Sequence, residues 1–104
     1  MTGTSSRSVL AAADIDALAA AVVACPAVAG LHEGGNQAVA TYLPGRRVVG
    51  VRVEDQRVLV SVVLAAGSSV RMLEDQVRRN LAPLVGDHRI DVHVADLQTA
   101  RVHP

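Results

Sequence analysis

Aromatic residues are almost absent from this sequence, and Tyr42 is the single one among 104 residues. Half of the residues are apolar, mainly Val, Ala and Leu, so the chain is expected to fold around a core of small aliphatic side chains. The shortage of aromatics removes the stacking platforms with which proteins hold unpaired bases. Formal net charge is zero, which gives no general attraction for phosphates. These two absences argue against nucleic-acid binding.

Lysine is absent, cysteine occurs once, and no long hydrophobic run is present. We interpret the use of Arg alone, together with the richness in Ala and Val, as the mark of a GC-rich genome rather than of an anion site. The lone Cys25 cannot form a disulfide within the chain, so an oxidising compartment is not indicated. The longest weakly polar run, residues 17–30, is shorter than the roughly 20 residues of a membrane span. We therefore expect a cytoplasmic protein.

Two amphipathic helices are predicted. Asp14 can cap the first, and Pro26 ends it, which predicts a helix over residues 14–25. A serine after Gly67 caps the second, which ends near Gly86. The second helix has the clearest periodicity of the chain, with apolar residues at steps of three and four. Its predicted buried stripe consists of Val70, Leu73, Val77, Leu81 and Leu84.

Extended segments fill the rest of the chain. Alternating valines predict strands at residues 48–54 and 57–65, joined as a hairpin by Asp55 and Gln56. The second of these strands is apolar on both sides, which is typical of a central strand. Shorter strands are predicted at residues 28–31, 38–43 and 90–94.

This order predicts an α+β fold with two layers: a small mixed or antiparallel sheet, and two amphipathic helices on one of its faces. One domain of 104 residues can bury a core of its own. We expect a flexible N-terminal segment over residues 1–13, a single domain over residues 14–97 and a C-terminal tail over residues 98–104.

Several of these elements carry residues that resemble the alkaline shock protein family, the Gls24-like envelope stress response proteins of bacteria. The run Gly50-Val51-Arg52-Val53-Glu54 is similar to the Gly-Val-basic-Val-Glu strand of that family. Gln76-Val77 in the second helix and the alternating residues 90–94 are similar to later family segments, and residues 28–31 to an earlier one. The resemblance covers about residues 14–97.

The resemblance implies a non-enzymatic cytoplasmic protein that self-associates as a homo-oligomer. It also implies recruitment to the inner face of the membrane by a small anchoring partner, and a link to envelope stress. No direct membrane insertion is expected.

Candidate catalytic and ligand-binding residues are few, and we predict no catalytic, cofactor or metal site. Asp91 and His93 share one face of a strand, but a zinc site needs three or four convergent ligands, and nothing brings His32, His88 or His103 to them. Cys25 lies at a helix C-terminus, where a thiol is not activated, and is interpreted as a small buried hydrophobe. The glycines at residues 30–35 lack the Lys and Ser or Thr of a phosphate-binding loop.

A candidate interaction surface follows from the hairpin. Leu59 and Val63 point away from the face that the two helices cover, and Val48 is expected beside them on the paired strand. No third helix is available to cover these residues. Exposed apolar surface of this kind and an open strand edge both favour a homo-oligomer.

Two other classes of function remain open. One is a nucleic-acid-binding domain of the KH kind, which shares the size and class of fold but needs a G-x-x-G loop that the sequence lacks. The other is a small-molecule sensing module that dimerises through its sheet.

Overall fold

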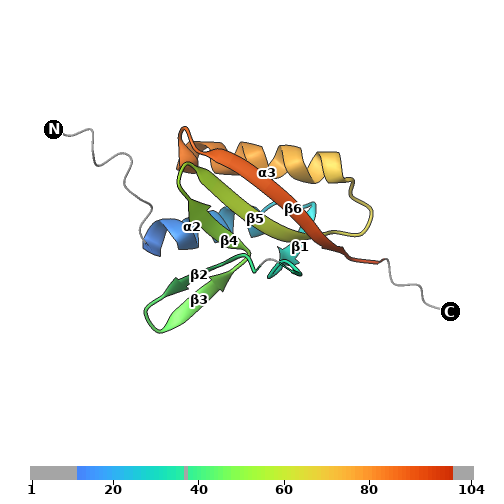
Figure 1. Cartoon of the computed structure of the whole chain (residues 1–104). Coiled ribbons are helices and arrows are strands. Elements are labelled where there is room, and N and C mark those ends of the chain that lie inside the picture. The colour runs from blue at the N-terminus through green and yellow to red at the C-terminus, as the bar shows by residue number, and fades with distance from the viewer. Residues whose placement is uncertain (1–11, 37, 100–104) are drawn as a thin grey trace.

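Strand β5 (Arg57–Leu64) is the centre of the sheet in the computed structural model, which describes residues 12–36 and 38–99. Strand β6 (Arg89–Leu97) lies parallel to β5 along its length. On the other side of β5, β4 (Val51–Glu54) pairs antiparallel with its first half and β1 (Val28–Leu31) with its second half. The four strands form the predicted small mixed sheet (Figure 1).

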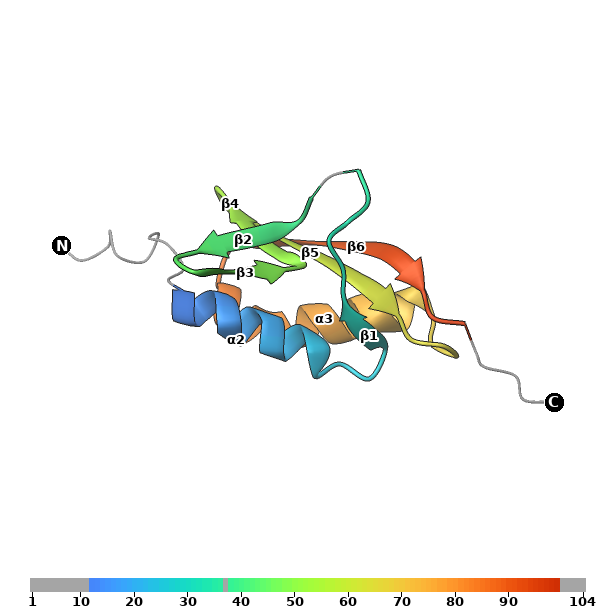
Figure 2. The same ribbon diagram turned by 90° about the horizontal axis from the view of Figure 1, so that it is seen from below.

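Both helices lie on one face of this sheet. Helix α3 (Val70–Val85) connects the parallel strands β5 and β6, as a parallel pair requires a crossover. Helix α2 (Ala12–Val23) packs beside α3 under the same face (Figure 2). The predicted α+β architecture, with two helices on one face of the sheet, is therefore confirmed. The core between the layers includes Leu18, Val22, Leu73, Val77 and Leu81 from the helices, and Val51, Val58, Val60 and Val62 from the strands.

A separate hairpin lies in the sequence between β1 and β4. Strands β2 (Ala40–Leu43) and β3 (Arg46–Val49) pair antiparallel and form a two-stranded sheet of their own. The continuous strand predicted over residues 48–54 is therefore wrong, because β3 ends and β4 begins on either side of Gly50. That residue has a φ of 87°, in the left-handed region that favours glycine. Its N–H donates to Val39 O at 2.7 Å and its carbonyl accepts from Ser61 N at 2.9 Å.

Helix α2 is shifted by two residues from the predicted range 14–25, whereas the ends of α3 agree with the prediction. Helix α2 begins at Ala12, so Asp14 lies in its first turn and not at its cap, where a negative charge is still favourable. It ends at Val23, because Pro26 disfavours a helical conformation at the preceding residue. In α3 the predicted serine cap is confirmed, and it is Ser69, whose hydroxyl accepts from Met72 N at 3.1 Å.

The middle of the predicted α3 stripe is buried and its ends are not. Val70 and Leu84 are 46% and 42% exposed, whereas Val85 is buried. Burial follows steps of four from Leu73 to Val85, so Leu84, three residues after Leu81, lies beside the buried stripe and not in it.

The predicted terminal segments lie almost entirely outside the described residues. Of segment 1–13 only residues 12 and 13 are described, and of segment 98–104 only residues 98 and 99. The described elements run from Ala12 to Leu97.

Candidate functional site

The candidate functional site is the sheet face opposite the helices, which we call the open face. Side chains alternate along a strand, so the residues between the buried valines of β5, and between the half-buried valines of β6, point to this face. Pairing aligns Leu59 with Asp91, and Ser61 with His93. The parallel register thus brings an acid and an imidazole from β6 next to the apolar residues of β5.

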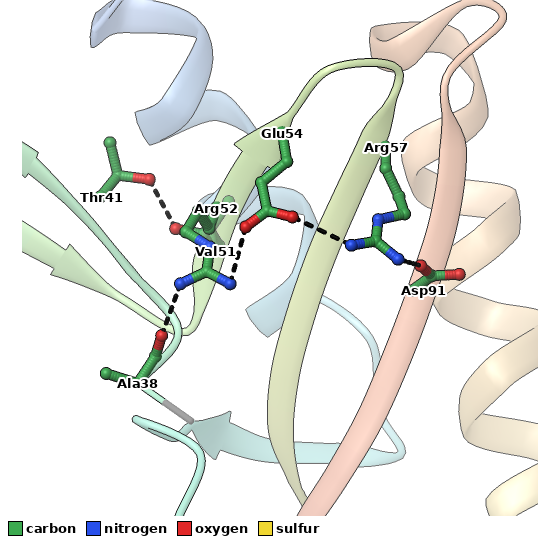
Figure 3. Close-up of polar contacts among 7 residues, drawn as sticks. All are labelled: Ala38, Thr41, Val51, Arg52, Glu54, Arg57 and Asp91. Atoms are coloured by element: carbon green, nitrogen blue, oxygen red, sulfur yellow. Dashed lines mark hydrogen bonds and ion pairs between the residues drawn. The ribbon is translucent and has the colours of Figure 1, made fainter. Parts of the chain in front are cut away.

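A row of ion pairs crosses the open face at the start of β5 (Figure 3). Arg52 on β4 lies 2.8 Å from one oxygen of Glu54, measured between Nη2 and Oε2. The other Glu54 oxygen accepts from Arg57 Nη2 at 2.9 Å. Arg57 then reaches across to β6, where its Nη1 lies 3.3 Å from Asp91 Oδ2. Three strands are linked by four side chains of alternating charge.

The row has an electrostatic consequence for Glu54. The hydrogen bond from Arg57 and the charge of Arg52 both favour the carboxylate, and together they hold the pKa of Glu54 below its ordinary value. The negative charge of Glu54 is thereby stabilised between two guanidinium groups. All four side chains are partly exposed, so their interactions are screened by solvent and salt.

The segment after β1 crosses the middle of the open face. His32 N donates to Ser61 O at 2.9 Å, and Arg52 Nη1 donates to Ala38 O at 2.8 Å. Gly34 N donates to His32 Nδ1 at 2.9 Å, which shapes the turn that follows. Ser61 is completely buried, and its hydroxyl has no hydrogen-bond partner within the described residues. The sequence left open how this face is covered, and this segment covers part of it.

A groove of about 340 Å³ lies between that segment and strand β6. Its lining is mainly apolar and includes the polar side chains of Asn36, Asp91 and His93. It is lined by Gly34, Gly35, Asn36, Val39, Leu59, Val60, Asp91, Val92 and His93. A mainly apolar lining with a few polar groups is the usual composition of a ligand site.

The three residues of the predicted interaction surface are not brought together. Leu59 and Val63 lie half-buried on β5, and Leu59 lines the groove. Val48 belongs to β3, pairs with Thr41 and packs against the hydrophobic core. Its expected place beside Leu59 is taken by Arg52, because β4 and not β3 pairs with this part of β5.

The prediction that Asp91 and His93 share one face of the strand is confirmed, and both line the groove. His32 and His88 have other partners. The ring of His32 accepts from Gly34 N, and that of His88 lies 2.8 Å from Val85 O. His103 lies outside the described residues, and those residues contain no cluster of three or more metal-ligating side chains.

Cys25 is buried, as the sequence predicts, with 1% of its surface exposed. Burial raises the pKa of its thiol, although a hydrogen bond from Asn80 Nδ2 at 3.3 Å acts in the opposite direction. Asn80 of α3 also donates to Ala21 O of α2 at 3.1 Å, so this side chain links the two helices. A protonated, buried thiol is a poor nucleophile.

The adjacent Arg46 and Arg47 do not form a free basic patch. Arg46 makes two hydrogen bonds to the Asp16 carboxylate, at 2.8 and 3.0 Å. Arg47 Nη2 lies 2.7 Å from Glu33 Oε2. Each positive charge of this pair is thus balanced by a neighbouring carboxylate.

No protein-family model, curated protein or solved structure matches this chain. The resemblance to the alkaline shock protein family therefore stays a prediction. Within the described residues, no helix has both the length and the apolar character to cross a bilayer.

Sequence reasoning found Asp91, His93 and Leu59 but missed the ion-pair row and the groove. In the sequence, Arg52 and Glu54 alternate with Val51 and Val53, which places them on the other side of the strand. The sequence does not reveal the register between β5 and β6, which places Arg57 beside Asp91. Nor does it reveal that the segment after β1 crosses the open face.

Proposed function

We propose that this protein is a non-enzymatic domain that self-associates through its open sheet. The supporting observation is that both helices cover the same face, while β6, a strand of nine residues, has no strand on its outer side within the described chain. An unpaired strand is a template for a strand of another chain, since main-chain bonds supply affinity and alternate side chains supply specificity.

The apolar residues of the sheet support the same proposal. Leu59 and Val63 remain half-buried on the open face, and the half-buried residues Ile90, Val92 and Val94 reach the edge of the layer between sheet and helices. A second chain placed against β6 would remove part of this surface from water, at about 25 cal/mol for each Å².

A non-enzymatic role is supported by the state of the one cysteine. Cys25 is the residue type with the strongest intrinsic nucleophilicity in the chain, but it is buried and its pKa is raised. The rest of the proposal depends on the family resemblance. It consists of a cytoplasmic location, recruitment to the membrane by a small anchoring protein and a link to envelope stress.

Sedimentation of the wild-type protein over a range of concentrations tests the proposal. We expect the average mass to rise with concentration, and a mass that stays monomeric at high micromolar concentration would refute self-association. The double variant Leu59→Arg/Val63→Glu distinguishes the open face from the edge. If it folds and is monomeric, the face is the interface; if it still associates, the edge is. Co-purification of the tagged protein with a small membrane protein tests the recruitment part.

The groove favours a second candidate function, a small-molecule sensing module. Its volume of about 340 Å³ is within the range of small-ligand sites, and Asp91, His93 and Asn36 offer polar contacts. A ligand that binds only the folded state raises its stability. Thermal unfolding with a metabolite collection tests this function, and a shift that is lost in Leu59→Arg would place the ligand in the groove.

A further inference from the structure

The outer edge of β6 has a defined set of hydrogen-bonding groups. Arg89 N donates to Gln56 O at 2.8 Å, so the backbone of Arg89 faces β5. Arg78 Nη1 on helix α3 donates to Ile90 O at 2.8 Å, so the backbone of Ile90 faces outward. Because the backbone groups of successive strand residues point to opposite sides, those of Val92 and Val94 face outward as well.

The straight part of this edge is short. The pairing of β6 with β5 shifts after Val94, where Val63 pairs with Asp96 and leaves Ala95 without a partner on β5. Such a bulge bends the strand and changes the alternation of its side chains. Regular pairing with another strand is therefore confined to residues 90–94.

The side chains of this segment form two rows. Ile90, Val92 and Val94 point to the helix side and pack against the core. Asp91 and His93 point to the open face. The acid and the imidazole lie symmetrically on either side of Val92, so the segment is complementary to itself when it is reversed.

We infer that a second copy of this chain pairs with β6 in antiparallel orientation, about a twofold axis at Val92. This inference rests on the proposed self-association and specifies its geometry. Val92 faces its own copy at the axis, and Ile90 faces Val94 of the second copy. Asp91 then faces His93 of the second copy, and this pair occurs twice. The backbone groups on the outward edge of both chains form on the order of six hydrogen bonds.

The neighbouring registers are less favourable. The outward backbone groups of one copy must bond to the outward backbone groups of the other, and these belong to every second residue. The alternative registers therefore have their twofold axis one residue away, at Asp91 or at His93. An axis at Asp91 places two carboxylates against each other, and an axis at His93 places two imidazoles together. Two carboxylates directly opposite each other destabilise a strand pair, whereas a carboxylate opposite an imidazole can accept a hydrogen bond from a ring N–H.

Arg78 agrees with this placement. It already donates to Ile90 O, the first outward carbonyl of the edge. A carbonyl oxygen has two lone pairs, so Ile90 can accept a second bond from Val94 N of the second copy. Charged side chains over a strand edge hinder pairing there. Arg78 therefore favours a strand pair whose centre lies on the C-terminal side of Ile90.

A charge swap tests the register by sedimentation equilibrium. His93→Asp places two carboxylates opposite each other at two positions, and we expect the dissociation constant to rise by about tenfold or more. The double variant Asp91→His/His93→Asp restores an acid opposite an imidazole at both positions, and we expect association within about threefold of the wild type. His32→Asp is the matched control: it makes the same change of charge away from β6 and keeps an acceptor for Gly34 N.

Each result separates the two proposals. A wild type that stays monomeric refutes self-association and this register with it. If the wild type associates and His93→Asp behaves like His32→Asp, self-association stands and the register at Val92 is wrong. Weak association of both the single and the double variant would place the axis at His93. Tighter association of His93→Asp would place it at Asp91, where the new carboxylate meets Arg89.

Discussion

The bend at Gly50 provides the sharpest test of the fold. Gly50 has a φ of 87°, and a Cβ atom built on it would lie 2.8 Å from Leu31 Cβ and 2.9 Å from Ser61 O. Neither neighbour is the end of a flexible side chain, since one is a Cβ and the other a backbone carbonyl. Gly50→Ala must therefore displace the contact between the bend, β1 and β5.

The expected loss of stability has two parts. A residue with a Cβ in the left-handed region costs roughly 1–2 kcal/mol. Overpacking at a site that cannot expand adds about 1–3 kcal/mol. We expect Gly50→Ala to lower the free energy of unfolding by about 2–5 kcal/mol, a large part of the total stability of a domain of this size.

Two other glycines separate these parts. Gly45 has a φ of 79°, but a Cβ built there meets nothing within 4 Å, so Gly45→Ala is expected to cost only the conformational part, about 1–2 kcal/mol. Gly30 has no such φ and equally open surroundings, so Gly30→Ala is expected to be neutral or to stabilise by up to about 1 kcal/mol.

Urea unfolding followed by far-UV circular dichroism measures all three variants, since a chain with one Tyr and no Trp gives little fluorescence. The expected order of destabilisation is Gly50, then Gly45, then Gly30. Equal losses for Gly50→Ala and Gly45→Ala would show that the close approach at the bend is wrong.

Three further measurements address other parts of the molecule. Leu73→Ala empties a fully buried site and is expected to lower the free energy of unfolding by about 2–5 kcal/mol. Arg79→Ala, on the exposed side of the same helix, is expected to lower it by under about 0.5 kcal/mol. Equal urea midpoints for the two variants would show that the buried face of α3 is assigned wrongly. The pKa of Glu54 is lowered in the folded protein, so this group stabilises the fold at pH values above its ordinary pKa of 4.5. That stabilisation is lost as the pH falls through the folded-state pKa. Glu54→Gln should therefore lose less stability than the wild type on acidification, and parallel pH curves would refute this. Cys25 should resist iodoacetamide in the folded protein and react in urea, whereas rapid native alkylation would refute its burial.

The helices and the central strand could be predicted because their periodicity is local. Leu73, Val77 and Leu81 recur at helical spacing, and all three are buried. The run of apolar residues in β5 predicts a central strand, which the sheet order confirms, and the residues on its helix side, Val58, Val60 and Val62, are completely or almost completely buried. Such patterns depend only on neighbours in sequence, so they need no knowledge of the fold.

The error at Val48 shows where this kind of inference ends. Simple alternation from residue 48 to residue 54 places Val48, Arg52 and Glu54 on one face. The bend at Gly50 interrupts this alternation and turns the hairpin, so that Val48 packs against the core while Arg52 and Glu54 stay on the open face. The left-handed φ of Gly50 depends on the close approach of Leu31 and Ser61, which come from distant parts of the sequence.

The ion-pair row depends on information of the same kind. Arg57 and Asp91 meet because helix α3 returns the chain to the start of β5, and the length of that crossover sets the register of β6. A single sequence gives no measure of this register. The charged residues of the row can therefore be identified in the sequence, but the contacts between them cannot be predicted from it.

The two edges of the sheet differ in how far other groups already occupy them, and this difference decides where another chain can add. At the β4 edge, Thr41 Oγ donates to Val51 O at 2.6 Å and the hairpin β2–β3 lies alongside. Arg52 also reaches over this side of the sheet to Ala38 O. At the β6 edge the described residues supply one such contact, from Arg78 to Ile90 O. Pairing at β4 must first displace a packed hairpin, whereas pairing at β6 adds bonds to backbone groups that otherwise face water. The free-energy difference between these two routes favours β6, and an interface there would involve Asp91, which already pairs with Arg57 in the ion-pair row and lines the groove.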